Sequence, residues 1–362
     1  MDGNDSTKQP PRRSKARRLA FLLAACFLFL LFWLAVAEAV LRFREHRALP
    51  PSAAPSTAAP SAAARSTAGP VLMFEADAEL GWKNKPGNYE FPFPKPPGGD
   101  RKITILPDGT RATGPARTGA SAKVFLFGCS YAQGWGIADN ETLAWKLQSQ
   151  YPAFEFRNFG TTAYGTYQSL LLLRRALKGP ERPVLVIYAL VQHHEYRNVA
   201  QAAWLESLSP LGRGERGQLP YCTLDRSGAL VEHPPATYPE WPLRRRLATV
   251  RALERIVTTS LSRQRERVRT EVTEKLILEM RDLCKAQGAA FVFLPLRINA
   301  QDKHQHYLEF ARKNGISTVD CCDLFHPTSD LIVPEDDHPN ERLNSLWAER
   351  VGQALKPMMN NE

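Results

Sequence analysis

The sequence lacks several patterns that would assign a function directly. None of its 6 cysteines stands in a Cys-x-x-Cys pair, so their spacing fits no zinc-ribbon or zinc-finger pattern. No nucleic-acid-binding motif accompanies the excess of 47 Lys+Arg over 37 Asp+Glu, and we therefore expect no nucleic-acid partner. No stretch repeats at a fixed period, which argues against a solenoid or a propeller.

Composition and length leave a globular chain with appendages. The 362 residues are enough for one large domain or two small ones, and 43% hydrophobic content supports a buried core. The formal net charge of +10 favours anionic partners such as a membrane surface or an acidic polysaccharide. The charge says nothing about the fold.

The N-terminus contains one long apolar run. Residues 19–37, LAFLLAACFLFLLFWLAVA, carry no charge and nearly cross the hydrocarbon core of a bilayer, and Val40 and Leu41 extend them. We expect a transmembrane helix at 19–41 that anchors the chain in the inner (cytoplasmic) membrane. Six basic residues precede it, so the tail 1–18 should stay cytoplasmic and the rest should be periplasmic.

A cleaved signal peptide is the alternative for this segment, because Ala35-Val36-Ala37 resembles a cleavage site. The apolar run is longer than the usual core of a signal peptide, which favours the anchor. Both interpretations export the domain.

Two segments connect the anchor to the main domain. Residues 42–70 are rich in Pro, Ala and Ser and cannot bury a core, so we expect an extended linker. Residues 71–121 mix aromatics with turn residues, and a Pro-Asp-Gly turn follows the strand-like ITIL. We expect a small N-terminal β extension there.

From residue 122 to residue 357 the sequence alternates between buried strands and helices. This alternation predicts an α/β fold, a three-layer α/β/α sandwich with a mostly parallel sheet. Asp139 or Asn140 is expected to cap the first helix. The expected strands are 123–127, 154–160, 182–191, 289–296 and 317–324, and the expected helices are 141–151, 166–179, 272–288, 306–315 and 341–355.

An insertion at 203–269 interrupts this alternation. It is expected to be irregular as far as Pro242 and then to form a basic helix. The many arginines of that helix could bind an anionic glycan or lipid headgroups, or they could be a solvated helix face. The expected apolar face consists of Leu243, Leu247, Val250, Leu253, Ile256 and Val257.

Ser130 is the main candidate for a nucleophile. It follows the apolar run KVFLF and a glycine, at the carboxyl end of an expected strand, where ligands gather in open parallel sheets. The surrounding residues do not form Gly-x-Ser-x-Gly, so the nucleophile elbow of α/β-hydrolases does not apply. The preceding Cys129 is an alternative nucleophile, but it is expected to point inward as a small buried thiol.

The arrangement resembles the SGNH (GDSL-like) hydrolase family, and in particular its membrane-anchored bacterial members. Gly128-Cys129-Ser130 matches the Gly-Asp-Ser block, and Asp336-Asp337-His338-Pro339-Asn340 matches the late Asp-His block. The resemblance implies that Ser130 is the nucleophile, His338 its base and Asp336 the carboxylate that orients the imidazole. Asp337 and Glu335 lie nearby, so the choice of carboxylate stays open.

The resemblance also implies an oxyanion hole that departs from the family pattern. The backbone N–H of Ser130 would supply one donor. The glycine of the second block falls on Ala163, which keeps its N–H, and the asparagine of the third block falls on His193. A histidine ring can donate a hydrogen bond as an amide does.

The expected function is therefore a membrane-anchored, exported serine ester hydrolase or O-acyltransferase that works through an acyl-serine. The resemblance implies acyl esters of envelope carbohydrate as substrate and neither cofactor nor metal. The alternative is a glycan-binding or assembly protein of an acylation system with little or no turnover. A metal held by His193 and His194 with the acidic block is disfavoured, because neighbouring side chains on an extended segment point to opposite sides. The sequence leaves open whether Cys222, Cys284, Cys321 and Cys322 pair, and it leaves the oligomeric state open.

Overall fold

The computed structural model describes residues 15–47, 73–90, 102–114, 122–208, 217–326, 328, 330–333 and 336–359. The chain divides into two compact units, Met1–Ala54 with Pro239–Thr258, and Pro55–Tyr238 with Thr259–Glu362. The predicted linker lies almost entirely outside the described residues, as does most of the N-terminal tail.

The larger unit is built on one parallel sheet of five strands in the order β11-β10-β7-β5-β6. The central strands are buried on both faces, which explains their continuous apolar sequences. The strands are β5 (Ala122–Phe127), β6 (Phe154–Asn158), β7 (Pro183–Val191), β10 (Ala290–Arg297) and β11 (Ser317–Thr318).

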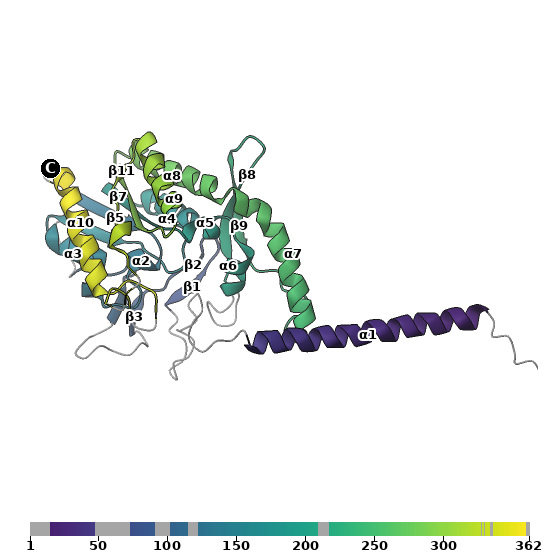
Figure 1. Cartoon of the computed structure of the whole chain (residues 1–362). Helices are drawn as coiled ribbons and strands as arrows, with labels where there is room; N and C mark the ends of the chain where they lie inside the picture. Colours follow the sequence, from purple (N-terminus) through teal and green to yellow (C-terminus); the bar gives the residue numbers. More distant parts are fainter. Residues whose placement is uncertain are drawn as a thin grey trace, which may run out of the picture. The chain divides into compact units, whose positions relative to one another are not determined.

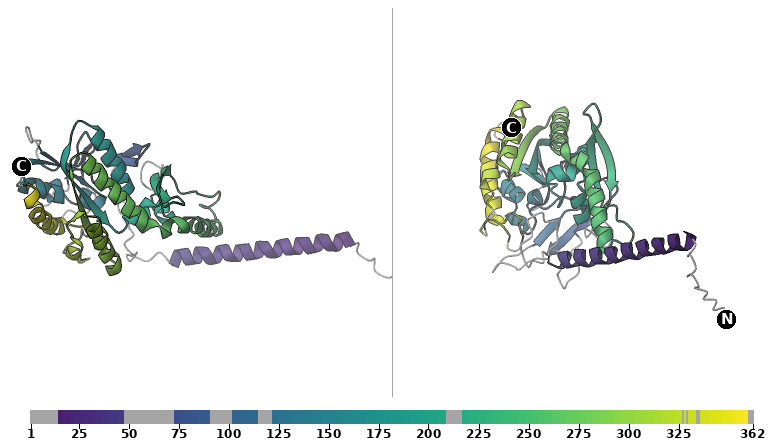
Figure 2. Two further views of the ribbon diagram at one scale, coloured as in Figure 1. Left: turned by 90° about the horizontal axis from the view of Figure 1, so that it is seen from above. Right: turned by 45° about the vertical axis from the view of Figure 1, so that its right-hand side comes forward.

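Helices cover both faces of this sheet (Figure 1 and Figure 2). One face packs on α4 (Thr166–Lys178), α8 (Arg269–Ala286) and α9 (Gln301–Lys313). The other packs on α2 (Ser130–Gln133), α3 (Leu143–Gln150) and α10 (Glu341–Met359). The predicted α/β sandwich with a parallel sheet is confirmed.

The segment before the sheet forms two antiparallel ladders. One joins β1 (Phe74–Asp77) to β2 (Gly81–Asn84), and the other joins β3 (Gly87–Glu90) to β4 (Lys102–Ile105). A small core of its own includes Met73, Ile103 and Ile105 together with Trp135 and Val333. This segment therefore supports the loops that follow β5 and precede α10.

The insertion is more regular than predicted. Helix α5 (His194–Asn198) precedes the insertion. Before Pro242 the insertion contains most of α6 (Ala202–Ser207) and a hairpin of β8 (Leu219–Leu224) and β9 (Leu230–Ala236). The turn of the hairpin is closed by Asp225, whose carboxylate accepts from the backbone of Ser227 and Ala229. The expectation of an irregular segment was wrong, because this Asp-Arg-Ser-Gly turn joins two short strands into a hairpin.

The basic helix α7 (Ala248–Arg267) is present, but its predicted apolar face is partly wrong. Leu253 and Ile256 are 53% and 66% exposed. Glu254 is fully buried instead, where it pairs with Arg244 and accepts from the backbone N–H of Trp241. A buried ion pair thus takes the place that the periodicity assigned to apolar side chains.

Two smaller expectations also need correction. Thr142, rather than Asp139 or Asn140, caps α3, with its hydroxyl accepting from the N–H of Trp145. The last predicted strand ends after Thr318 and gives way to a short 3-10 helix, η3 (Cys322–Leu324). The sequence left the pairing of the cysteines open. In the structure all 6 cysteines are free thiols.

The smaller unit contains α1 (Lys15–Arg47), which is 33 residues long and apolar enough to cross a membrane. Its large apolar side chains from Leu19 to Leu34 are exposed. Near its C-terminal end Glu38 accepts from the backbone N–H groups of Ala248 and Thr249 and so caps the start of α7.

Candidate active site

Ser130 stands at the first position of α2, directly after the turn that ends β5. Gly128 has φ 155°, and a Cβ there would lie 2.9 Å from both the Ala132 Cβ and the Ala189 carbonyl oxygen. Only glycine fits this approach of β5 to β7. The tight turn brings the Ser130 hydroxyl to the carboxyl edge of the sheet.

The structure brings Ser130, His338 and Asp336 together. The Ser130 Oγ lies 2.8 Å from His338 Nε2, and the Asp336 carboxylate is hydrogen-bonded to His338 Nδ1. Asp336 also accepts from the backbone N–H of His338 at 3.2 Å, so a turn of three residues fixes the pair. Ser130 and His338 are 208 positions apart in sequence and meet because Ser130 follows the inner strand β5 and His338 lies just before α10, which packs on the same side of the sheet.

The geometry chooses between the carboxylates that the sequence left open. Asp336 contacts the imidazole, whereas Asp337 contributes only its backbone carbonyl, which accepts from the Tyr131 hydroxyl at 3.3 Å. Glu335 lies outside the described residues. Among the described residues, Asp336 is the carboxylate in contact with His338.

Asp336 is held in its charged form by its neighbours. Burial alone would raise the pKa of this carboxyl, but the adjacent His338 and the hydrogen bonds that Asp336 accepts together lower the pKa below its ordinary value. One of these bonds comes from the indole of Trp135, with Nε1 3.2 Å from Oδ2. Sequence patterns gave no sign of Trp135, because nothing in its local sequence marks a contact 201 residues away.

Ala163 is buried on the loop that faces Ser130 and adopts a left-handed backbone conformation with φ 68°. The same loop is tied to the turn before Ser130, because the Thr161 N–H donates to the Gly128 carbonyl at 3.1 Å. The left-handed conformation gives a physical reason why a glycine suits this position. The role of the Ala163 N–H as an oxyanion donor stays a prediction.

Substitutions of Ala163 should separate backbone strain from side-chain packing. We expect Ala163→Gly to change the free energy of unfolding by less than about 1 kcal/mol, since relief of strain offsets the greater freedom of the unfolded chain. Ala163→Val should destabilise the fold by more than about 2 kcal/mol, because a β-branched residue resists positive φ. Urea denaturation measures both, and equal effects of the two variants would contradict the account.

The sequence suggested that His193 lies on an extended segment. In the structure it stands just before α5 in a helical backbone conformation. Burial, together with the nearby charges of Arg197, Arg297 and His338, lowers the pKa of His193 to about 3. The ring is therefore neutral at physiological pH and keeps one N–H to donate. His194 is fully buried in the core, where its Nδ1 bonds the Tyr188 hydroxyl at 2.8 Å, so the two rings do not face one site.

These two histidines should make stability depend on pH. Burial also lowers the pKa of His194 well below its ordinary value. Below about pH 6.5 the unfolded chain binds protons that the folded chain excludes, so the free energy of unfolding should fall as pH drops. His193→Gln should reduce this slope by at most about 1.4 kcal/mol per pH unit between pH 6.5 and about 3. Urea denaturation at several pH values measures it, and an unchanged slope would contradict a buried neutral ring.

Cys129 is buried, and the guanidinium of Arg197 lies near its side chain. Arg197 is itself 5% exposed, donates to the Tyr164 carbonyl at 2.8 Å and lies over the Trp204 ring. An aspartate at position 129, as in the Gly-Asp-Ser block, would meet this cation directly. The inward orientation of the cysteine agrees with the sequence-based expectation and disfavours it as the nucleophile.

Arg111 is the most deeply buried charge beside the site, and sequence analysis missed it. It reaches from the N-terminal segment into the loop after α2, where it pairs with Asp139 at 3.0 Å and donates to the carbonyls of Gln133, Gly134 and Ile137. The loop that it holds carries Trp135. An arginine after a Pro-Asp-Gly turn gives no sequence signal for burial.

Comparisons with known proteins give distant structural likenesses only. No family model and no curated protein matches the chain. Among solved structures, TesA is 14% identical over 65% of this chain and 98% of that chain, with a TM-score of 0.38. A lipolytic protein of the G-D-S-L family from Veillonella parvula is 10% identical over 65% and 99%, with a TM-score of 0.40. Axe2, an acetylxylan esterase from Geobacillus stearothermophilus, is 11% identical over 66% and 96%, with a TM-score of 0.37.

At these identities and TM-scores the likenesses support no conclusion about fold, activity or substrate. The fold follows from the chain's own elements: a parallel sheet with helices on both faces, a serine after an inner strand and a histidine before the last helix. The chain has an α/β fold in which a parallel sheet of five strands is covered by helices on both faces.

Proposed function

We propose that the chain is a serine ester hydrolase or O-acyltransferase that acts on acyl esters through an acyl-Ser130 intermediate. The observation that carries the proposal is the relay of contacts from Ser130 Oγ to His338 Nε2, at 2.8 Å, and from His338 Nδ1 to Asp336. A serine hydroxyl is a weak nucleophile until a base within hydrogen-bond reach removes its proton.

The proposed mechanism follows from these contacts. Ser130 Oγ attacks the ester carbonyl while His338 Nε2 takes its proton, and Asp336 stabilises the imidazolium that forms. The oxygen of the tetrahedral intermediate would accept from the Ser130 and Ala163 N–H groups and from the neutral ring of His193. His338 then protonates the leaving alcohol, and water releases the acid or a second hydroxyl takes the acyl group.

The substrate class and location are further parts of the proposal. We propose acyl esters of envelope carbohydrate, which rests on the family resemblance, with no cofactor. The exposed apolar surface of α1 is unsuited to water and supports a membrane anchor, and the basic residues before it support a cytoplasmic N-terminus. The domain would then act on the periplasmic side.

Turnover of p-nitrophenyl acetate by the full chain in detergent tests the proposal. Wild type should hydrolyse the ester, and Ser130→Ala should lose at least about 1,000-fold in kcat/KM. Cys129→Ala is the matched control, since it removes the neighbouring nucleophile and should keep turnover within about tenfold. Absent turnover in wild type, with binding of acylated oligosaccharide retained, would instead support the glycan-binding alternative.

Trp135→Phe tests the support of the catalytic carboxylate. The substitution keeps an aromatic ring beside His338 but removes the N–H that bonds Asp336. We expect kcat to fall about 10-fold with KM nearly unchanged, because a hydrogen bond to a charged group contributes roughly 1.5–3 kcal/mol. Steady-state kinetics measure it, and an unaltered kcat would show that the indole does not position Asp336.

A further inference from the structure

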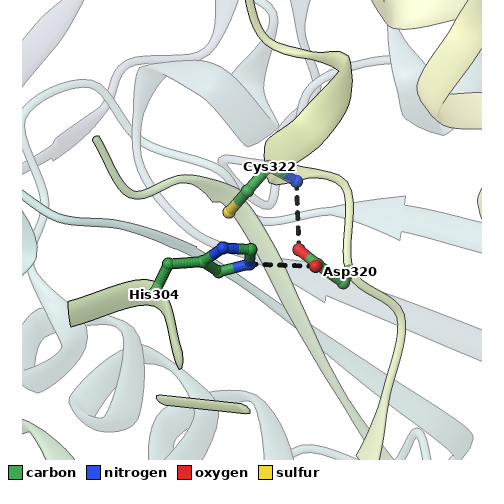
Figure 3. A group of neighbouring side chains, drawn as sticks. All are labelled: His304, Asp320 and Cys322. Atoms are coloured by element: carbon green, nitrogen blue, oxygen red, sulfur yellow. Dashed lines mark hydrogen bonds and ion pairs between the residues drawn. The ribbon is translucent and has the colours of Figure 1, made fainter. Parts of the chain in front are cut away.

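A second cluster of reactive side chains lies at the edge of the sheet, apart from the triad. His304 of α9 and Asp320 and Cys322 of the segment after β11 point toward one another (Figure 3). Their donor atoms, one nitrogen, one oxygen and one sulfur, all lie within 4.8 Å of one another. β11 is an edge strand, whereas Ser130 follows β5, which is separated from it by β10 and β7.

Hydrogen bonds connect the three residues of this cluster. His304 Nε2 lies 2.9 Å from Asp320 Oδ2, and the Cys322 backbone N–H donates to Asp320 Oδ1 at 3.1 Å. His304 and Asp320 are thus in direct contact, and Cys322 is tied to Asp320 through its backbone.

The backbone that carries two of these side chains is fixed. The N–H groups of Val319 and Cys321, on either side of Asp320, donate to the carbonyls of Phe293 and Pro295 in β10 at 2.9 Å each. Arg350 of α10 donates to the Asp320 carbonyl at 3.1 Å. The ligand positions are therefore set by the sheet and not by a free loop, which lowers the cost of ordering them around an ion.

From this geometry we propose that His304, Asp320 and Cys322 bind a zinc ion. Tetrahedral zinc, with bonds of about 2.0–2.3 Å, needs donor atoms roughly 3.5 Å apart, so side-chain rotations alone close the cluster around it. A thiolate with an imidazole selects zinc over magnesium or calcium, which prefer oxygen ligands. All three residues are half-buried, so a water molecule would complete the coordination of the ion. The ion would link α9 to the edge of the sheet.

The same helix provides a control for this proposal. His306 of α9 pairs with Glu274 at 2.6 Å, so it forms a histidine–carboxylate contact like that of His304 with Asp320. No cysteine joins that pair among the described metal-ligand groups. If a histidine–carboxylate pair alone were enough to bind zinc, the His306–Glu274 pair would bind the ion as well as the His304 cluster.

The test uses the full chain in detergent, purified with a histidine-free tag and carrying Cys26→Ser to remove the exposed thiol of α1. Zinc is titrated against a competing chromophoric chelator, and cobalt(II) is used as a spectroscopic probe. We expect one equivalent of zinc, a thiolate-to-cobalt charge-transfer band, and a higher melting temperature with zinc.

Variants distinguish the proposed ligands from chance binding. Cys322→Ser should abolish the charge-transfer band, and Cys322→Ser and His304→Ala should each weaken zinc binding by at least about 100-fold. His306→Ala should bind as the parent does. Circular dichroism confirms that each variant is folded. No stoichiometric zinc binding by the parent chain, or a cobalt band that survives Cys322→Ser, would overturn the proposal, whatever the esterase assays show.

Discussion

Replacing Asp336 with asparagine is expected to lower kcat for ester hydrolysis by about 10⁴-fold while the fold stays intact. The Asp336 carboxylate accepts from His338 Nδ1 and so keeps the unprotonated Nε2 toward Ser130. An asparagine amide can donate to Nδ1 instead, which places the ring proton on Nε2 and removes the base. Stopped assays with p-nitrophenyl acetate, together with thermal unfolding, measure the two effects separately.

Asp337→Asn is the matched control for this prediction. It makes the same chemical change one residue later, where only the backbone carbonyl is in contact with the site, through Tyr131. We expect kcat to change by less than about threefold. If the two variants lose activity equally, the carboxylate that serves His338 has been assigned wrongly.

The second large effect is on stability. Arg111→Met should lower the free energy of unfolding by about 3–5 kcal/mol, because it leaves Asp139 without its cation and the loop carbonyls without their donor. The loop that carries Trp135 would loosen, so kcat should fall as well. Guanidinium denaturation measures the stability, and activity is assayed well below the unfolding midpoint.

Arg312→Met provides the comparison, since Arg312 is exposed on α9. It should change the free energy of unfolding by less than about 0.5 kcal/mol. An Arg111 variant as stable as the Arg312 variant would mean that the N-terminal segment does not brace the catalytic loop.

The sheet and the candidate triad could be predicted because their signals are local. Continuous apolar runs such as that of β7 occur where both faces of a strand are covered, and Ser130 follows such a run directly. The contact between Ser130 and His338 could not be predicted from local sequence patterns, because the two residues are 208 positions apart. The family resemblance provided that link, and the geometry brings the two side chains together.

The features that sequence analysis missed depend on long-range contacts. Arg111 and Trp135 support the site from segments whose local sequence is typical of exposed turns. Glu254 is buried in α7 because Arg244 neutralises it, whereas periodicity assigns buried positions to apolar residues only. His304 on α9 lies beside Asp320, a contact that no sequence pattern marks. In each case a polar group is placed by a partner that the hydrophobic pattern does not reveal.

Covalent labelling with a fluorophosphonate, followed by peptide mass spectrometry of the full chain, tests the central claim most directly. The account predicts one adduct, on Ser130, which forms slowly or not at all in His338→Ala because the hydroxyl has lost its base. An unmodified Ser130 in folded wild-type protein, or labelling as fast in His338→Ala as in wild type, would contradict it.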